Sequence, residues 1–274
     1  LVRRLTADRH EVHLYACSWD PSALPAGLHF HAAPRRRGPR FLRPWAFSAA
    51  CAEARRGAGH DLSIGFDKTT GVDLVYALGG LHAASAEHNL LKHRPPVMRG
   101  LAGLGKCLSP AHWSFALLER RQYLGPGRPL IVVNSRMVRD HFRRRLGVAP
   151  SDVRVVHGAI DPARFAGQDR AERRRRRRRE WSLGPDETVA AFVGMNYRLK
   201  GMEPLLHALR RMWRDRPFLL LVAGSPRTAE WERLAAKLGV ADRVRFVGYC
   251  ADMRDAYFAA DFLVHPTFYD PCSN

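Results

Sequence analysis

Short apolar runs alternate along the chain with stretches whose apolar residues recur at helical spacing. The second half shows this alternation most regularly. Its runs predict strands over residues 188–193, 218–223, 244–247 and 262–265, and the stretches between them predict helices over 201–215, 229–238 and 251–260. Because these runs are apolar at successive positions, they predict strands of parallel sheets that helices cover on both faces.

The first half follows the same pattern. Strands are predicted over residues 11–15, 28–31, 62–64, 73–78, 129–133 and 152–157, and helical segments over 46–56, 83–121 and 137–146. Ser135 is predicted to cap the last of these helices. Trp113, Phe115 and Tyr123 are candidate core residues in and beside the long helical stretch.

Two series of strands and helices predict two Rossmann-like domains. We predict a first domain over residues 1–160, a linker that carries a run of arginines over 161–185, and a second domain over 186–274. The chain begins on residues typical of the end of a helix and stops in a loop after a strand. We therefore expect a fragment that lacks both ends.

Composition narrows the class of protein. With 46% hydrophobic residues the chain can bury a large core, which excludes a disordered protein. Its five cysteines form no C-x-x-C pair, which argues against a disulfide framework and against a structural zinc site. No run approaches the roughly 18 apolar residues that span a bilayer. We expect a soluble or peripheral protein in a reducing, cytoplasmic compartment.

The chain is strongly basic, with 45 lysines and arginines against 26 acidic residues and a net charge of +19. Seven consecutive arginines, Arg173 to Arg179, supply part of this excess. A basic surface attracts nucleic acid, anionic lipid or phosphorylated glycolipid without choosing among them. The chain contains no nucleic-acid-reading motif, so we expect no specific nucleic-acid binding. The arginine run itself is typical of a solvated helix or linker.

Candidate binding residues follow the predicted strands, because parallel sheets bind ligands beyond the carboxyl ends of their strands. Gly194 ends one strand, and Arg198 and Lys200 follow in the loop before a helix. Two cations beside a helix N-terminus suit a diphosphate, and the alternative is an exposed basic turn. Asp270 lies in the loop after the last strand, where it can accept sugar hydroxyls or belong to an ordinary turn.

A second candidate site lies in the first half. Gly79 and Gly80 follow the strand predicted over 73–78, and His82 comes directly after them. Glycines at a strand end let the backbone approach a ligand closely. A histidine in such a loop can be structural as well as functional.

Four segments of the second half resemble, in order and spacing, the nucleotide-sugar-binding domain of retaining glycosyltransferases of the family 4 type. They are F-V-G…R-L-K-G-M at 192–202, L-L-L-V-A-G-S at 219–225, V-R-F-V-G-Y at 244–249 and A-A-D-F-L-V-H-P-T-F-Y-D at 259–270. The first half resembles the lipopolysaccharide core glucosyltransferase I subgroup, through the segments at 65–77, 133–142 and 156–165. The resemblance implies the α/β fold called GT-B, two Rossmann-like domains whose parallel sheets face each other across a cleft.

The resemblance also implies roles for particular residues. Lys200 falls on the family's lysine that contacts the donor diphosphate, and Arg198 lies close to it, whereas the family's arginine position holds Met195. Asp270 falls on the first acidic residue of a pair, usually Glu, that holds the donor sugar. The implied catalytic residues are His82, Lys200 and Asp270, and the implied donor-binding residues are Gly79, Gly80, Gly194, Arg198, Lys200, Asp270, Ser273 and Asn274.

In the first domain the resemblance places Gly79, Gly80 and His82 among the groups that face donor sugar and acceptor. The subgroup has an acidic residue at about Gly79, so this chain departs from it there. No metal and no cofactor are implied, because Lys200, Arg198 and a helix N-terminus would stabilise the departing diphosphate.

The reaction implied is transfer of a hexose, glucose in this subgroup, from UDP-glucose with retention of configuration to a lipopolysaccharide core or other cell-envelope glycan. An anionic glycolipid acceptor would place the enzyme peripherally on the cytoplasmic face of the inner membrane. One alternative is a catalytically silent basic protein that binds nucleic acid or another polyanion on the same fold. Another is a phosphorylase or epimerase of that fold.

Overall fold

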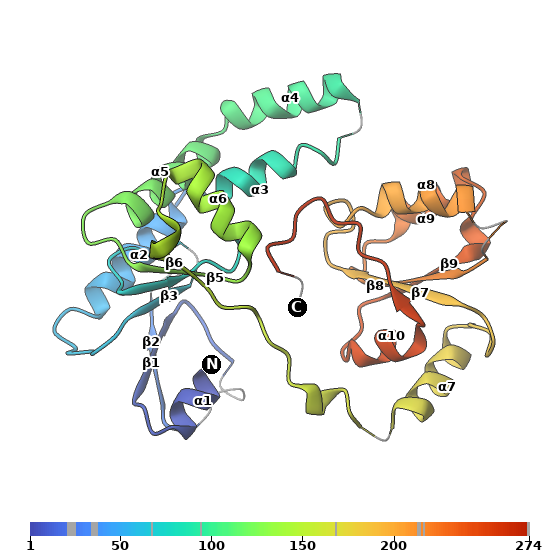
Figure 1. Cartoon of the computed structure of the whole chain (residues 1–274), viewed down its shortest axis with the longest axis horizontal. Helices are drawn as coiled ribbons and strands as arrows, with labels where there is room; N and C mark the ends of the chain where they lie inside the picture. Colours follow the sequence, from blue (N-terminus) through green and yellow to red (C-terminus); the bar gives the residue numbers. More distant parts are fainter. Residues whose placement is uncertain are drawn as a thin grey trace. The chain divides into compact units, whose positions relative to one another are not determined.

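A computed structural model describes residues 1–20, 26–33, 38–66, 68–93, 95–167, 169–212, 215 and 217–272. The chain forms two compact units, one of residues 1–87, 95–158 and 271–272 and one of residues 88–93 and 159–270 (Figure 1). Each unit combines parallel strands with helices, which confirms the predicted α/β class.

The first unit contains a two-stranded sheet, β1-β2, and a four-stranded sheet in the order β3-β4-β5-β6, and all of these pairs are parallel. Its elements are α1 (Val2–Ala7), β1 (Val12–Ala16), β2 (Leu28–Ala32), α2 (Arg43–Ala54), β3 (Ile64–Phe66), β4 (Leu74–Tyr76), α3 (His82–His88), α4 (Pro96–Cys107), α5 (Pro110–Leu124), β5 (Leu130–Val133), α6 (Arg136–Leu146), the 3₁₀ turn η2 (Pro150–Asp152) and β6 (Val153–Val155).

The helical stretch predicted over 83–121 is three helices rather than one. Pro96 and Pro110 stand at the first positions of α4 and α5, where a residue without a backbone N–H starts a helix but cannot continue one. Tyr123 is buried, as predicted. The prediction that Trp113 belongs to the core is wrong, because its side chain is 60% exposed and its indole N–H donates to the carbonyl of Cys107 at 2.6 Å.

Side chains define two further boundaries in this unit. Ser135 caps α6 as predicted, since its hydroxyl accepts the N–H of Val138 at 3.3 Å. Strand β3 begins at Ile64, two residues later than predicted. The reason is that the backbone N–H and hydroxyl of Ser63 both donate to the carboxylate of Asp73, at 2.8 and 2.5 Å.

The second unit contains one parallel sheet in the order β10-β7-β8-β9. Its elements are the 3₁₀ turn η3 (Pro162–Arg164), α7 (Arg170–Glu180), β7 (Val189–Gly194), α8 (Met202–Met212), β8 (Leu219–Gly224), α9 (Ala229–Lys237), the 3₁₀ turn η4 (Ala241–Arg243), β9 (Val244–Gly248), α10 (Arg254–Ala259) and β10 (Phe262–Leu263).

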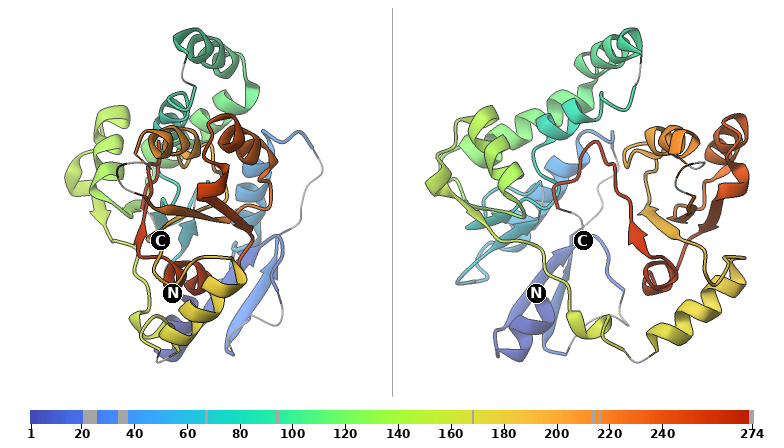
Figure 2. Two further views of the ribbon diagram at one scale, coloured as in Figure 1. Left: turned by 90° about the vertical axis from the view of Figure 1, so that its right-hand side faces the viewer. Right: turned by 45° about the vertical axis from the view of Figure 1, so that its right-hand side comes forward.

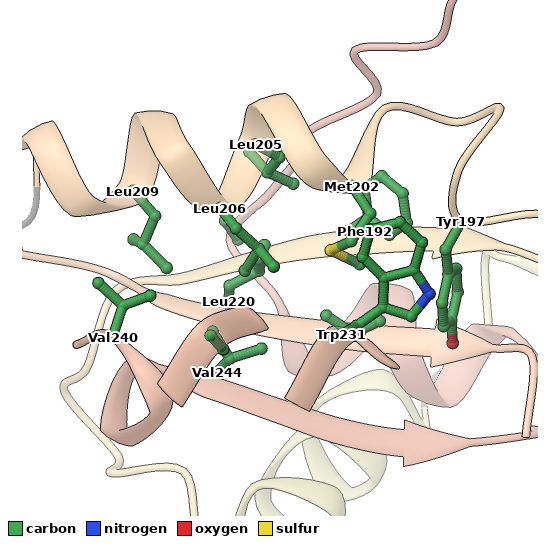
Figure 3. Close-up of a cluster of buried hydrophobic side chains, with 13 residues drawn as sticks. Phe192, Tyr197, Met202, Leu205, Leu206, Leu209, Leu220, Trp231, Val240 and Val244 are labelled. Atoms are coloured by element: carbon green, nitrogen blue, oxygen red, sulfur yellow. The ribbon is translucent and has the colours of Figure 1, made fainter. Parts of the chain in front are cut away.

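Helices cover both faces of this sheet, as the apolar strands predict. Alternate residues of β7 and β8 point to opposite faces. Phe192 and Leu220 pack with the apolar side chains of α8 and α9, and Figure 3 shows Leu206 and Leu209 of α8 directed toward the sheet. Residues one position along, such as Ala191 and Leu221, pack on the other face with α10.

No helix among the described residues combines the length and the apolar character that crossing a membrane requires.

Helix α7, which carries the arginine run, packs against α10 in the second unit (Figures 1 and 2). Arg178 is only 4% exposed. Its guanidinium donates to the carbonyls of Ala259, Gly184 and Pro185 at 2.8 to 2.9 Å, and to the carboxylate of Asp261 at 2.9 Å. Arg178 therefore joins the end of α10 to the segment that enters β7.

Neighbouring arginines of the run extend this contact. Arg173 and Arg177 both bond the buried carboxylate of Asp255, at 2.9 and 2.6 Å. Burial alone would raise the pKa of Asp255, but the hydrogen bonds and charges of Arg177 and Arg173 hold that pKa below its ordinary value. Arg174 donates to three carbonyls at the carboxyl end of α10.

The prediction of a solvated arginine run is therefore wrong for one face of α7. Positions 173, 174, 177 and 178 share a helical face, and that face meets carboxylates and the unpaired carbonyls at the end of α10. Both are acceptors that suit guanidinium groups. Arg175, Arg176 and Arg179 lie on the opposite, exposed face.

Replacing Arg178 by alanine is expected to lower the free energy of unfolding by about 1–3 kcal/mol, because the buried guanidinium bonds the carbonyls of Gly184 and Pro185 and shares a carbonyl of α10 and the carboxylate of Asp261 with Arg174. The exposed neighbour Arg176→Ala is the matched control, with an expected change within about 0.5 kcal/mol. Urea unfolding of the full-length protein measures both. Equal effects of the two substitutions would show that the contact of α7 with α10 adds no stability.

Candidate active site

The loop from Gly194 to Gly201 connects β7 with α8 through a tight turn. The side-chain oxygen of Asn196 accepts the N–H of Leu199 at 3.1 Å, and the carbonyl of Asn196 accepts the N–H of Lys200 at 2.9 Å. These bonds hold Lys200 two residues before the start of α8, where helix N–H groups and the helix dipole favour negative charge.

Tyr197 anchors this loop. The side chain is buried, its hydroxyl donates to the carbonyl of Ser225 at 3.0 Å, and its ring packs against Phe192 and Trp231 (Figure 3). Burial raises the pKa of Tyr197 to about 12, so the hydroxyl keeps its proton and remains a donor. Tyr197 is not among the residues that the sequence predicted for the site; the available signal was an aromatic residue in a short loop between a strand and a helix.

The loop that follows β10 is fixed to the same turn. The N–H of Phe268 donates to the carbonyl of Leu199 at 3.0 Å, and the hydroxyl of Thr267 donates to that carbonyl at 3.4 Å and to the carbonyl of Tyr269 at 3.0 Å. Gly201 has a φ of +85°, and a Cβ built there would collide with the carbonyl of Pro266. Glycine at position 201 thus allows the two loops to touch.

Lys200 and Asp270, 70 residues apart in sequence, meet where these loops touch. The ammonium of Lys200 forms an ion pair with Oδ2 of Asp270, and the two side chains are 21% and 13% exposed. Nε2 of His265 lies 3.0 Å from the same oxygen. The structure therefore brings two of the predicted residues together and adds His265. The sequence signal for His265 was its place at the end of the last strand, five residues before Asp270.

Gly194 and Arg198 are the other described donor-site residues predicted in this unit, and both have neighbours other than Asp270. Gly194 lies against Lys200, since a Cβ built at Gly194 would stand 3.0 Å from Cγ of that lysine. Arg198 is directed to α9, where it forms an ion pair with Glu230 and lies 5.7 Å from the ring centre of Trp231. The predicted residues Ser273 and Asn274 lie outside the described residues.

The predicted residues of the first unit lie after β4. Gly80 has a φ of +68° in the turn that leads into α3, which a residue without a side chain adopts easily. His82 begins α3; its backbone N–H donates to the buried carboxylate of Glu119 at 2.6 Å, and its Nε2 lies 3.1 Å from Nδ1 of His112. Gly79, by contrast, is exposed, with open space where a Cβ would stand.

The chemistry of the second-unit site follows from its charges. A lysine at the start of a helix binds phosphate oxygens, and a carboxylate beside it accepts hydrogen bonds from hydroxyl groups. In the part of the chain that the structure describes, no group of three or more His, Cys, Asp or Glu side chains is placed to hold a metal ion.

Comparison with protein families gives matches over both units. The model of Glycosyltransferase Family 4 matches residues 1–164, more than half of the chain, and a model described as glycosyl transferases group 1 matches residues 187–274. The chain belongs to Glycosyltransferase Family 4. Both matches agree with the resemblance that the sequence segments indicate.

Several curated proteins are similar to this chain over most of the chain's length. A probable transglycosylase of Burkholderia thailandensis is 32% identical over 87% of the chain and 58% of its own length. The lipopolysaccharide glucosyltransferase WaaG of Escherichia coli is 22% identical over 98% of the chain and 69% of its own length. The chain thus spans 58% of the first of these relatives.

Solved structures show that this family member has the predicted GT-B fold. The crystal structure of WaaG superposes with a TM-score of 0.76 at 21% identity, covering 98% of the chain and 71% of WaaG. HepE of Anabaena superposes with a TM-score of 0.52 at 16% identity, covering 87% of the chain and 61% of HepE.

Gly201→Ala is expected to separate the loops that carry Lys200 and Asp270. The control Gly239→Ala has a similar positive φ but open space around its Cβ, and should cost about 1–2 kcal/mol of unfolding free energy. Gly201→Ala should cost about 1–3 kcal/mol more, because its methyl group meets the carbonyl of Pro266. Urea unfolding distinguishes the two; equal losses would contradict the close contact of the loops.

Proposed function

We propose that the full-length protein is a retaining glycosyltransferase that moves glucose from UDP-glucose to a lipopolysaccharide core or other cell-envelope glycan. The observation that carries this proposal is the meeting of Lys200 with Asp270 beside the start of α8. This arrangement offers a cation for the diphosphate and a carboxylate for the sugar within a single site.

The mechanism follows from where charge develops. When the bond between the anomeric carbon and the diphosphate breaks, negative charge grows on the departing diphosphate. Lys200 and the N-terminus of α8 stabilise that charge, so the reaction needs neither a cofactor nor a metal ion bound by the protein. The acceptor oxygen bonds the anomeric carbon on the face that the diphosphate leaves, which retains the configuration without a protein nucleophile. The proton of the acceptor hydroxyl passes to the departing phosphate oxygen.

The related proteins support this choice of substrates. WaaG is named a lipopolysaccharide glucosyltransferase, and other relatives, 34% identical over half of the chain in Corynebacterium kroppenstedtii, are named D-inositol 3-phosphate glycosyltransferases. Crystals of HepE hold UDP, or UDP with glucose. Because both HepE crystals hold UDP and one also holds glucose, UDP-glucose is the first donor to test.

Lys200→Ala is expected to lower the kcat/KM for release of UDP from UDP-glucose by about 100-fold or more, because the departing diphosphate loses its cation. Lys237→Ala, which removes an exposed lysine at the end of α9, is the matched control and should match the wild type. Turnover is expected to persist in EDTA. A Lys200→Ala variant as active as the wild type would refute the assignment of Lys200, and loss of activity in EDTA would refute metal independence.

The same proposal includes peripheral binding to the anionic cytoplasmic face of the inner membrane, and α4 offers a surface for it. No residue of α4 is buried, and the helix lies at the periphery of the first unit, away from the four-stranded sheet (Figure 2). Its apolar side chains, with the one that follows it, lie largely in solvent: Val97, Met98, Leu101, Leu104 and Leu108 are 49% to 74% exposed.

These five positions recur at helical spacing and so form one apolar face. Arg99 and Lys106 lie on the opposite side of this helix, and the ammonium of Lys106 bonds the carbonyl of Ala86. An exposed apolar face of this kind suits the boundary between the headgroups and acyl chains of a bilayer.

Replacing both Leu101 and Leu104 by aspartate is expected to weaken binding to phosphatidylglycerol-containing vesicles at least about tenfold, because two apolar side chains no longer enter the bilayer. Met212→Asp removes an exposed apolar side chain from α8 and is the matched control. Vesicle sedimentation at low and high salt measures the affinity. Equal binding by the double variant and the control would show that α4 does not contribute to membrane binding.

A further inference from the structure

Asp270 receives nitrogen atoms from two sides. Nζ of Lys200 and Nε2 of His265 both approach Oδ2, the histidine at 3.0 Å. An ionised carboxylate only accepts hydrogen bonds, so the proton in the contact with His265 lies on Nε2. Both contacts occur in a setting that is mostly shielded from solvent.

The proposed function draws Lys200 away from this carboxylate. A nucleoside diphosphate presents more negative charge to the ammonium than one carboxylate does. When Lys200 turns to the diphosphate, the carboxylate of Asp270, which is 13% exposed in this structure, loses that cation. Hydrogen-bond donors stabilise a largely buried carboxylate, and a donor that stays in place helps to set its orientation toward the sugar.

The backbone on both sides of His265 is held by contacts that do not involve the side chain of Lys200. His265 directly follows the residue whose N–H, that of Val264, donates to the carbonyl of Ala191 in β7 at 2.8 Å. On its other side Pro266 restricts the backbone and packs against Gly201. Strand pairing and this close packing therefore fix the backbone at His265 whichever partner the ammonium of Lys200 has.

We propose that His265 is a positioning residue for Asp270: it donates from Nε2 to Oδ2 and keeps the carboxylate oriented toward the donor-sugar hydroxyls while Lys200 binds the diphosphate. This inference rests on the proposed function. His265 itself need not touch the substrate, and all of its effect on turnover passes through Asp270.

A double-mutant cycle in the full-length protein tests this coupling. His265→Leu removes the donor and should lower kcat for UDP release from UDP-glucose at least about tenfold, with the Kd for UDP changed less than about twofold. In the Asp270→Ala background the same substitution should change kcat less than about twofold, because the carboxylate that His265 orients is gone. His265→Gln, whose amide can donate from a similar position, should recover most of the loss.

Three results would overturn the inference: His265→Leu as active as the wild type, an equal loss in the Asp270→Ala background, or a glutamine variant as impaired as the leucine variant. If His265→Leu misfolds and loses UDP binding, the His265→Gln variant tests the inference instead. Activity near that of the wild type supports donation from Nε2, and a tenfold loss contradicts it. A wild-type protein that binds no UDP refutes the proposed function instead.

Discussion

Strand β7 is the constraint on which the second unit depends, because it pairs with β8 on one side and β10 on the other and is buried on both faces. Its carboxyl end leads into the loop that carries Lys200. Its partner β10 leads into the loop that carries His265 and Asp270. Parallel pairing brings both loops to the same edge of the sheet, and contacts at Gly201 and Leu199 complete the approach.

The arginine run shows how a strongly charged segment can be part of the fold. Arg173, Arg174, Arg177 and Arg178 bond carboxylates and carbonyl groups around α10, so these cations are already engaged within the unit. A binding site for external polyanions would have to use the opposite face, where Arg175, Arg176 and Arg179 are exposed. The contacts of the inner face thus favour the enzyme interpretation over a protein whose arginine run exists to bind polyanions.

Much of the fold could be predicted from the sequence because the periodicity of β7, β8 and α8 is a local property. The positions of Lys200 and Asp270, in the loops that follow β7 and β10, could be predicted because both loops lie between recognisable segments of the family pattern. The role of Tyr197 could not, because its partner Ser225 is 28 residues away and the bond depends on the spacing of β7 and β8. The positions of Trp113 and Arg178 reflect tertiary packing, since the same residue types occur in cores and on surfaces.

We propose that the chain belongs to an enzyme that transfers glucose with retention. The most direct test is the ¹H NMR spectrum of UDP-glucose incubated with the full-length protein and a lipopolysaccharide-core oligosaccharide as acceptor. We expect UDP together with a new glucosyl anomeric signal of α configuration, the configuration of the donor. A new signal of β configuration, or no transfer to this or any other cell-envelope glycan acceptor, would contradict the proposal.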